Sequence, residues 1–397
     1  MKIDCINFTC QGESHKATNK VCQDYSYSKI YENGLAVAIV CDGHGGKRYF
    51  RSDIGARLAC EVTEKNVNVF LETIDKSLFT NKPYTSHTDI ATQIHNSQFE
   101  KENDIDKAFR QLFSSIIFDW NTKILEHAKS TPLNEEELQY LENDWKLDFE
   151  QGISLEKVYG CTLMTYVQTS TFWFAFHIGD GKCVSFDSDA KWSEPIPWDD
   201  RCFLNKTTSL CDSTAIEEFR YCYEGNGNFP SAIFLGSDGM DDSFGDELNL
   251  VNFYVQIVKE LAEKDKEDVL NEIKTTLPQL RKIGSKDDMS LAVVFNQEEL
   301  SKLLPRFISW QIDSTKNKIN NINIKILEKK SKISLLENTE NITKKTQIEY
   351  NYAFSDLKKL FTEKTGLVKR INILLNELYG EGFTPYMDSV GLQLEEQ

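Results

Sequence analysis

The sequence predicts an α+β protein in two parts, a domain over residues 1–299 and a helical extension over residues 300–397. In the first part, short apolar runs of strand length alternate with stretches in which apolar residues recur every three or four positions. In the second part, the apolar residues follow an approximate heptad spacing with few glycines and prolines. A chain of 397 residues is long enough for two or three domains.

The first predicted strand and helix follow one another directly. Residues 35–41 form a continuous apolar run that is rich in β-branched side chains, which is typical of a buried strand. Ile54, Leu58 and Val62 then recur at a spacing of four, which predicts a helix with one apolar face.

Further along, two strand-like runs at 162–168 and 172–178 are separated by three polar residues, and we expect them to form a hairpin. Residues 233–235 and 291–295 are short buried strands by the same criteria. Between them, a long helical pattern runs through residues 258–277.

Two stretches interrupt this alternation. Residues 71–105 are polar and irregular, and we expect a surface loop. Residues 131–157 are acidic, and Asn134 with Glu137 three residues later resembles the capping box that begins a helix. This segment either shapes a substrate groove or is a solvated surface helix, and we favour the second interpretation. The apolar stripe of the helix would consist of Leu138, Leu141 and Trp145.

The extension contains two apolar seams, and residues 337–347 would form the turn between them. A helical hairpin or coiled coil of this kind either braces the first domain or serves as an arm for self-association or partner binding. The first seam consists of Ile308, Ile312, Ile319, Ile322, Ile326, Ile333 and Leu336. The second seam consists of Phe354, Leu357, Phe361, Val368, Ile371, Leu375 and Leu378.

Composition narrows the function classes. The net charge of −17 disfavours binding to nucleic acid or to an anionic membrane surface. No run approaches 18 consecutive apolar residues, and the sequence begins with neither a basic nor an apolar signal segment. The ten cysteines contain no C-x-x-C pair, so we expect free, mostly buried thiols and a cytoplasmic protein.

Five short acidic motifs each lie next to a predicted strand or in an adjacent loop. Because strand ends at one edge of a sheet can converge, their carboxylates would repel one another unless cations lay between them. The motifs are Gln23-Asp24, Asp42-Gly43-His44-Gly45-Gly46, Gly179-Asp180-Gly181, Ser237-Asp238-Gly239 and Gly284-Ser285-Lys286-Asp287-Asp288.

Oxygen ligands of this kind suit Mn²⁺ or Mg²⁺. A pair of such ions binds phosphate oxygens and lowers the pKa of a shared water, which suits phosphoryl transfer. His44 is placed within the second motif to protonate a leaving alkoxide. Taken singly, each motif is more often a turn, and His44 alone could be a surface histidine. Their order along the chain is what favours a metal site.

In that order, the motifs resemble the PP2C family of metal-dependent protein phosphatases, in particular a bacterial-type branch. The resemblance covers residues 1–299 and excludes the extension. It is carried by Gly12 to Asp24, AIVCDGHGG at 38–46, GCTLM at 160–164, HIGDGK at 177–182, FLGSDGMDD at 234–242 and GSKDDMSLAVV at 284–294.

The resemblance implies an α-β-β-α sandwich, in which two antiparallel sheets pack face to face between helices. It also implies two metal ions, or three, with Asp42 bridging two of them. Asp242 and Asp288 lie next to these ligands. The other implied ligands are Asp238 and Asp287 for one ion, the Gly43 carbonyl for the other, and Asp24 and Asp180 for a third ion or its waters.

Two positions depart from the family pattern. Gln23 stands where the family usually has glutamate, so an amide replaces a charged ligand. Asn19 stands where the family often has an arginine that holds the substrate phosphate. Lys16, Lys20 or His15 would substitute for that arginine.

The resemblance implies hydrolysis of phosphoserine or phosphothreonine in proteins by in-line attack of a metal-bridging hydroxide, with His44 as general acid. The departures at Gln23 and Asn19 favour an alternative, a pseudophosphatase that binds phosphoproteins or a kinase without turnover. A third hypothesis is an assembly protein whose main element is the extension. Phosphorylated proteins are the expected partners, with a cognate serine/threonine kinase among them.

Overall fold

The computed structural model describes residues 3–87, 104–203, 206–338 and 343–388. The chain divides into two compact units, Met1–Lys302 and Leu303–Gln397. The division lies three residues beyond the boundary that we predict from composition.

Within the described residues, the first unit contains two antiparallel sheets. The five-stranded sheet has the order β1 (Ile3–Cys10), β11 (Met289–Asn296), β10 (Ala232–Gly236), β7 (Lys182–Phe186) and β8 (Trp192–Ser193). The six-stranded sheet has the order β2 (Tyr25–Ile30), β3 (Ala36–Cys41), β5 (Leu163–Gln168), β6 (Trp173–Ile178), β9 (Arg220–Glu224) and β4 (Thr85–His87).

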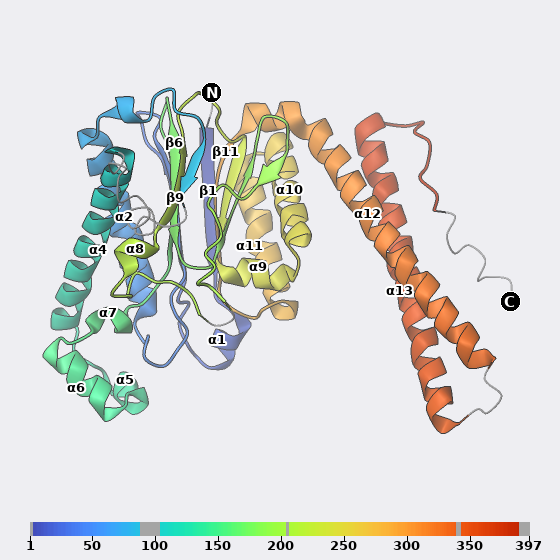
Figure 1. Cartoon of the computed structure of the whole chain (residues 1–397), viewed down its shortest axis with the longest axis horizontal. Helices are drawn as coiled ribbons and strands as arrows, with labels where there is room; N and C mark the ends of the chain where they lie inside the picture. The colour runs from blue at the N-terminus through green and yellow to red at the C-terminus, as the bar shows by residue number, and fades with distance from the viewer. Residues whose placement is uncertain (1–2, 88–103, 204–205, 339–342, 389–397) are drawn as a thin grey trace, which may run out of the picture. The chain divides into compact units, whose positions relative to one another are not determined.

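Helices cover the outer faces of both sheets (Figure 1). The long helices α2 (Ser52–Thr73) and α4 (Asp104–Ser130) cover the six-stranded sheet. The helices α9 (Asp238–Phe244), α10 (Glu247–Glu263) and α11 (Lys266–Ile283) cover the five-stranded sheet. The predicted α-β-β-α sandwich is therefore confirmed.

Strand β3 shows why an uninterrupted apolar run is needed here. Val37, Ile39 and Cys41 pack into the core beneath the helices, whereas Ala36, Ala38 and Val40 pack between the two sheets. Because successive side chains of a strand point to opposite faces, a strand covered on both sides must be apolar at every position. The remaining elements of this unit are α1 (Glu13–Ala17), η1 (Lys76–Leu78), α5 (Glu135–Tyr140), α6 (Asn143–Gln151), α7 (Leu155–Val158) and α8 (Ala215–Glu218).

Pairing confirms the predicted hairpin, since β5 pairs with β6 from Leu163 with Ile178 to Gln168 with Trp173. The helical pattern over 258–277 is divided into α10 and α11, because Asp265 caps a new helix by accepting from the amide of Glu267.

The prediction of a surface loop over 71–105 is wrong for its described part. Helix α2 continues to Thr73, and β4 pairs with β9. Phe79 is completely buried among aromatic rings, including that of Phe172 at a centroid distance of 4.7 Å. Residues 88–103 lie outside the described residues.

The acidic segment 131–157 contains α5, α6 and the start of α7, whereas the sequence predicts a single helix. The capping box of Asn134 and Glu137 is present at the start of α5. Leu141 follows the end of α5, and Trp145 belongs to α6, so the predicted stripe is divided.

The second unit is a helical hairpin of α12 (Gln297–Glu337) and α13 (Lys344–Tyr379), and α12 begins within the first unit. Most seam residues are buried, but Phe354 is 50% exposed, contrary to its predicted place in the seam. Lys329 of α12 forms an ion pair with Asp356 of α13 at 2.6 Å. One buried cluster consists of Ile308, Ile312, Ile319, Ile371 and Leu374, and another consists of Ile322, Ile326, Ile333, Ala353 and Leu357.

All ten cysteines are free thiols, as predicted. Among the described residues, no helix has the length and apolar content to cross a bilayer.

Candidate metal and substrate site

The predicted site aspartates come from the ends of strands in both sheets. Asp42 follows β3, Asp180 lies between β6 and β7, and Asp238 begins α9 directly after β10. Asp24 precedes β2, and Asp287 precedes β11. The fold brings these aspartates close enough for their charges to act on one another.

The repulsion among these charges raises the pKa values of several of the aspartates. Burial, followed by the charge of Asp238, raises the pKa of Asp42 well above its usual range. Burial, followed by the charges of Asp288 and Asp238, raises the pKa of Asp24. Burial, again with the charge of Asp238, raises the pKa of Asp180 to about 6. Asp238 is thus the charge shared by the cluster, and a cation among these groups would relieve their repulsion.

Two oxygen atoms fit this interpretation. The Oδ2 of Asp24 and the Oε1 of Gln23 are buried without a hydrogen-bond partner among the described residues. Buried polar atoms normally have partners, so these two are available to an ion or its water. The donor set consists of oxygens, which suits Mn²⁺ or Mg²⁺.

Asp288 ties the N-terminal segment to this cluster. Its carboxylate accepts from the backbone amides of Gly12 and Gln23, each at 2.6 Å, and lies 2.9 Å from Nδ1 of His15. Burial would raise the pKa of Asp288, but these hydrogen bonds, led by that of His15, outweigh it and lower the pKa. Asp288 therefore fixes the backbone of Gly12 and of Gln23, the residue before Asp24.

Gln23 also holds the loop that follows Asp42. Its Nε2 donates to Oγ of Ser52 at 2.5 Å and to the carbonyl of His44 at 3.0 Å. The backbone of Gly43 approaches so closely that a Cβ there would lie 2.4 Å from the carbonyl oxygen of Gln23. Only glycine fits that contact, so the first two acidic motifs depend on each other.

The imidazole of His44 is held by contacts with Ser209 and Tyr49. Its Nε2 lies 2.7 Å from Oγ of Ser209, and its ring packs edge-on against Tyr49 at 4.8 Å. Burial lowers the pKa of His44 to about 4, although the charge of Asp212 acts in the opposite direction.

Gly179, next to Asp180, is held by Thr208 on one side and by Arg220 of β9 on the other. Its amide donates to Oγ1 of Thr208 at 3.0 Å, and its carbonyl accepts from Nη2 of Arg220 at 2.5 Å. Gly179 has φ +131°, and a Cβ there would lie 2.5 Å from Cβ of Thr162. The backbone before Asp180 is therefore closely fixed.

Arg220 itself is almost completely buried. Its Nη1 donates to the carbonyl of Pro197 at 3.0 Å, and its Nε lies 3.7 Å from the carboxylate of Asp199. The carboxylate of Asp199 also accepts a hydrogen bond from Nε of Arg201 at 2.8 Å. A buried guanidinium needs such compensation, and here its fixed position serves the loop that carries Asp180.

The predicted phosphate-binding residues are divided between two places. Lys16, Asn19 and Lys20 line an open cavity of about 530 Å³, and Lys20 donates to the carbonyl of Gly45 at 2.8 Å. Asn19 has φ +55°, a conformation that asparagine tolerates better than arginine does. His15, by contrast, is buried against Asp288.

Two arginines after the glycines of the second motif have different surroundings. Arg51 forms a bidentate pair with Glu137, with Nε–Oε1 at 2.7 Å and Nη2–Oε2 at 2.9 Å. Arg51 also donates to the carbonyls of Thr131 and Pro132. Glu137 therefore clamps α5 to the domain, whereas most other acidic side chains of segment 131–157 are exposed, as expected for a solvated surface helix.

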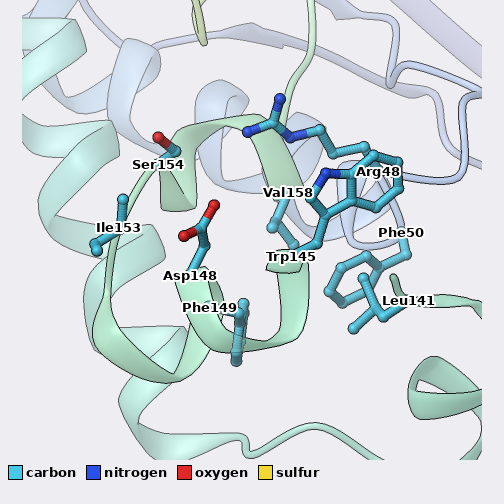
Figure 2. Close-up of a pocket in the computed structure, with 9 residues that line it drawn as sticks. All are labelled: Arg48, Phe50, Leu141, Trp145, Asp148, Phe149, Ile153, Ser154 and Val158. Carbon is cyan, nitrogen blue, oxygen red and sulfur yellow. The ribbon is translucent and has the colours of Figure 1, made fainter. Parts of the chain in front are cut away.

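The guanidinium of Arg48 lies over the indole of Trp145 at 5.8 Å. Figure 2 shows this pair at the hollow beside α6, with the Asp148 carboxylate pointing to the same side. Phe50 and Phe149, whose ring centroids are 6.0 Å apart, pack below.

The sequence analysis does not identify Ser209, Arg220, Arg51 or Arg48. Their partners lie far along the chain, so no local spacing marks them. Arginine within the apolar run of β9 is the one signal that could have indicated Arg220, because a charged residue in a buried strand needs a specific partner.

Comparison with known proteins adds a family assignment. The sequence model described as protein phosphatase 2C matches residues 11–277. No curated protein matches the chain. The solved serine/threonine phosphatase Stp1 from Staphylococcus aureus is 13% identical, with 75% of this chain and 96% of that chain covered and a TM-score of 0.42.

Two other solved structures are similar to the same degree. The S. agalactiae serine/threonine phosphatase is 15% identical, with 74% of this chain and 99% of that chain covered and a TM-score of 0.42. The catalytic domain of PstP, in complex with 2 manganese ions, is 15% identical, with coverage of 74% and 97% and a TM-score of 0.41. The family match spans well over half of the sequence, and the chain belongs to the protein phosphatase 2C family of metal-dependent serine/threonine phosphatases.

Proposed function

We propose that this chain is an active phosphatase that hydrolyses phosphoserine and phosphothreonine in proteins with Mn²⁺ or Mg²⁺. The observation that carries the proposal is the mutual repulsion of the buried and partly buried aspartates around Asp238, together with the unpartnered Oδ2 of Asp24. A site without ions would gain nothing from gathering these charges.

The ligand assignment follows from the positions of the aspartates. Asp42 would bridge two ions, Asp238 and Asp287 would complete the ligands of one, and the Gly43 carbonyl would bind the other. Asp24, Asp180 and Gln23 would hold a third ion or coordinated water. When bound, such ions neutralise phosphate oxygens and make water a nucleophile near neutral pH.

Protein groups supply the remaining steps. Lys16 and Lys20 would bind the substrate phosphate from their cavity, because Lys20 already contacts Gly45 of the second motif. Asn19 would donate from the same cavity. His44 would protonate the leaving serine or threonine oxygen as the attacking hydroxide forms the new bond to phosphorus.

The first test is hydrolysis of p-nitrophenyl phosphate with Mn²⁺, with Mg²⁺ and with a chelator. Asp238→Ala should abolish the metal-dependent rate. Asp268→Asn, a change of equal charge at an exposed site in α11, is the matched control and should keep it. A folded wild-type protein without activity in either metal would refute turnover.

That negative result would support the alternative, a pseudophosphatase that binds phosphoproteins or a kinase without turnover. The features that favour it are Gln23, whose amide adds no charge to the metal ligands, and Asn19, which supplies no guanidinium. Binding of a phosphopeptide without release of phosphate would identify this alternative directly.

We further propose that residues 1–299 form the catalytic domain and residues 300–397 an interaction element, in a cytoplasmic protein. Free thiols support a reducing compartment. Residues 297–302 of α12 also anchor the first unit, because Leu300 is completely buried and Ser301 donates to the carbonyl of Ala262 at 2.7 Å.

A chain ending at Lys302 tests the role of the extension. We expect it to fold, to keep its activity on p-nitrophenyl phosphate and to elute as a monomer, with any self-association confined to the full chain. Aggregation of this fragment would show that α12 and α13 instead brace the fold. The cognate kinase remains a proposed partner, to be tested by co-purification with the full chain and with the fragment.

A further inference from the structure

We propose that Arg48 binds an acidic side chain of the substrate next to the phosphorylated residue, so that the enzyme prefers phosphoprotein segments with acidic flanks. This inference rests on the proposed function, because it assigns a substrate class to the same site. The ligand chemistry is a carboxylate, for which the forked donors of a guanidinium are well suited.

The first observation is the contrast between Arg48 and Arg51. The guanidinium of Arg51 is buried, and its N–H groups are taken by Glu137, by two backbone carbonyls and by the hydroxyl of Tyr159. Arg48 has no ion pair or hydrogen bond within the described part of the chain. The domain therefore satisfies one arginine completely and leaves the other with open donors.

The second observation is that Arg48 is held in place without being neutralised. Its guanidinium lies over the Trp145 indole at 5.8 Å, a contact that fixes a cation but uses none of its N–H donors in the ring plane. Trp145 belongs to α6, within the acidic segment that Arg51 clamps through Glu137. An otherwise solvated segment is thus held where it supports Arg48 (Figure 2).

The third observation is the distance along the loop to the catalytic motif. Arg48 lies four residues after His44, and the turn between them is closed by the bond from the Tyr49 amide to the Gly46 carbonyl at 2.9 Å. The Tyr49 ring contacts His44 at 4.8 Å. This turn and this contact connect Arg48 to His44, and the proposal places a residue next to the phosphorylated one at Arg48.

Charge supports a carboxylate ligand. The chain carries a net charge of −17, yet the two segments beside the site present Lys16, Lys20, Lys47 and Arg48. Asp148 lines the same hollow as Arg48, and no ion pair within 4 Å joins them among the described residues. Asp148 would repel an acidic ligand, and it limits how tightly such a ligand is held.

The experiment compares two phosphopeptides of one sequence, one with glutamates and one with glutamines beside the phosphothreonine. The measured quantity is the ratio of their kcat/KM values. In the wild type we expect the glutamate peptide to be favoured. Arg48→Gln should lower that ratio roughly tenfold, the size of one charge-assisted contact. Arg48→Lys should lower it less, and Asp148→Asn should raise it.

The matched control is Arg57→Gln, an equal change of charge on α2, where Arg57 pairs with Glu61 at 2.6 Å. This variant should keep the wild-type ratio. Equal ratios in Arg48→Gln and Arg57→Gln would overturn the proposal, as would a wild type without preference. If no substrate is hydrolysed, the proposed function fails separately, and the affinities of the two peptides, measured by fluorescence anisotropy, still test Arg48.

Discussion

The Nε2 of His44 lies 2.7 Å from the Oγ of Ser209, a residue 165 positions further along the chain. The Ser209 hydroxyl donates to the carbonyl of Cys161 at 3.0 Å, so its oxygen accepts from His44. This arrangement places the hydrogen of the neutral imidazole on Nε2. Ser209 therefore occupies Nε2, which leaves Nδ1 as the nitrogen from which a protonated His44 would deliver a proton.

His44→Gln tests the role of this imidazole, because glutamine can still donate to Ser209 but cannot act as an acid. Serine and threonine leave as poor alkoxides, whereas nitrophenolate leaves without help. We expect kcat on a phosphopeptide to fall by roughly 10²- to 10⁴-fold, with a much smaller loss on p-nitrophenyl phosphate. Equal losses on the two substrates would show that His44 only supports the loop.

The stability of the metal-free protein should depend on pH through Asp180. Its folded pKa of about 6 lies above the ordinary value of 3.8, so the folded state binds more protons between these values. The contribution of Asp180 therefore becomes unfavourable as pH rises from about 4 to 6. Relative to the wild type, Asp180→Asn should gain stability over that window, by about 3 kcal/mol at pH 7. Urea unfolding with a chelator at pH 4, 5, 6 and 7 measures the difference, and a pH-independent difference would contradict it.

Restoring glutamate at position 23 should have two opposite effects. The Nε2 donors of Gln23 to Ser52 and to the His44 carbonyl would be lost, and a carboxylate would face that carbonyl. We expect Gln23→Glu to lower the free energy of unfolding without metal by about 1–3 kcal/mol. Its added charge should strengthen metal binding in calorimetry. Unchanged stability would mean that the amide donors contribute nothing.

Arg220 should act on metal affinity through Gly179. Arg220→Met removes the donor to the carbonyl before Asp180, and losing such an outer partner typically weakens metal binding by roughly 10- to 100-fold. The measurement is calorimetric titration with Mn²⁺. Arg201→Met, which removes the other arginine at Asp199 but no contact to Gly179, is the control and should have a smaller effect. Lost stability with unchanged affinity would assign Arg220 a structural role only.

The sequence analysis is most accurate where chemistry and structure are both local. The buried strand, predicted at residues 35–41 and observed at Ala36–Cys41, follows from its own side chains, and the aspartates are predicted because each follows or precedes such a strand. The seams of the extension are predicted for the same reason, since helical spacing repeats along a single element. Phe354 is exposed despite its predicted place in the seam, because the geometry of the hairpin, and not spacing alone, determines which residues face inward.

The errors involve contacts that only the folded chain creates. The polarity of residues 71–105 predicts a loop, but β4 pairs with β9 more than 130 positions away, and Phe79 packs against Phe172, 93 positions away. The clamp of Arg51 on Glu137, which no local spacing indicates, spans 86 positions. His15 is likewise buried, away from the cavity that Lys16 lines, because it contacts Asp288, 273 positions away.

The pairing of β1 with β11 has a consequence for biosynthesis. Ile3 pairs with Asn296 and Cys10 with Met289, so β1 is synthesised long before the strand with which it pairs. The hydrogen bonds from Gly12 and Gln23 to Asp288 form only after the same delay. A nascent chain interrupted before β11 would lack the strand that pairs with β10, and its aspartate cluster would be incomplete. Premature termination should therefore yield no partly active phosphatase. It should instead yield a sheet with an exposed edge, to which chaperones must bind.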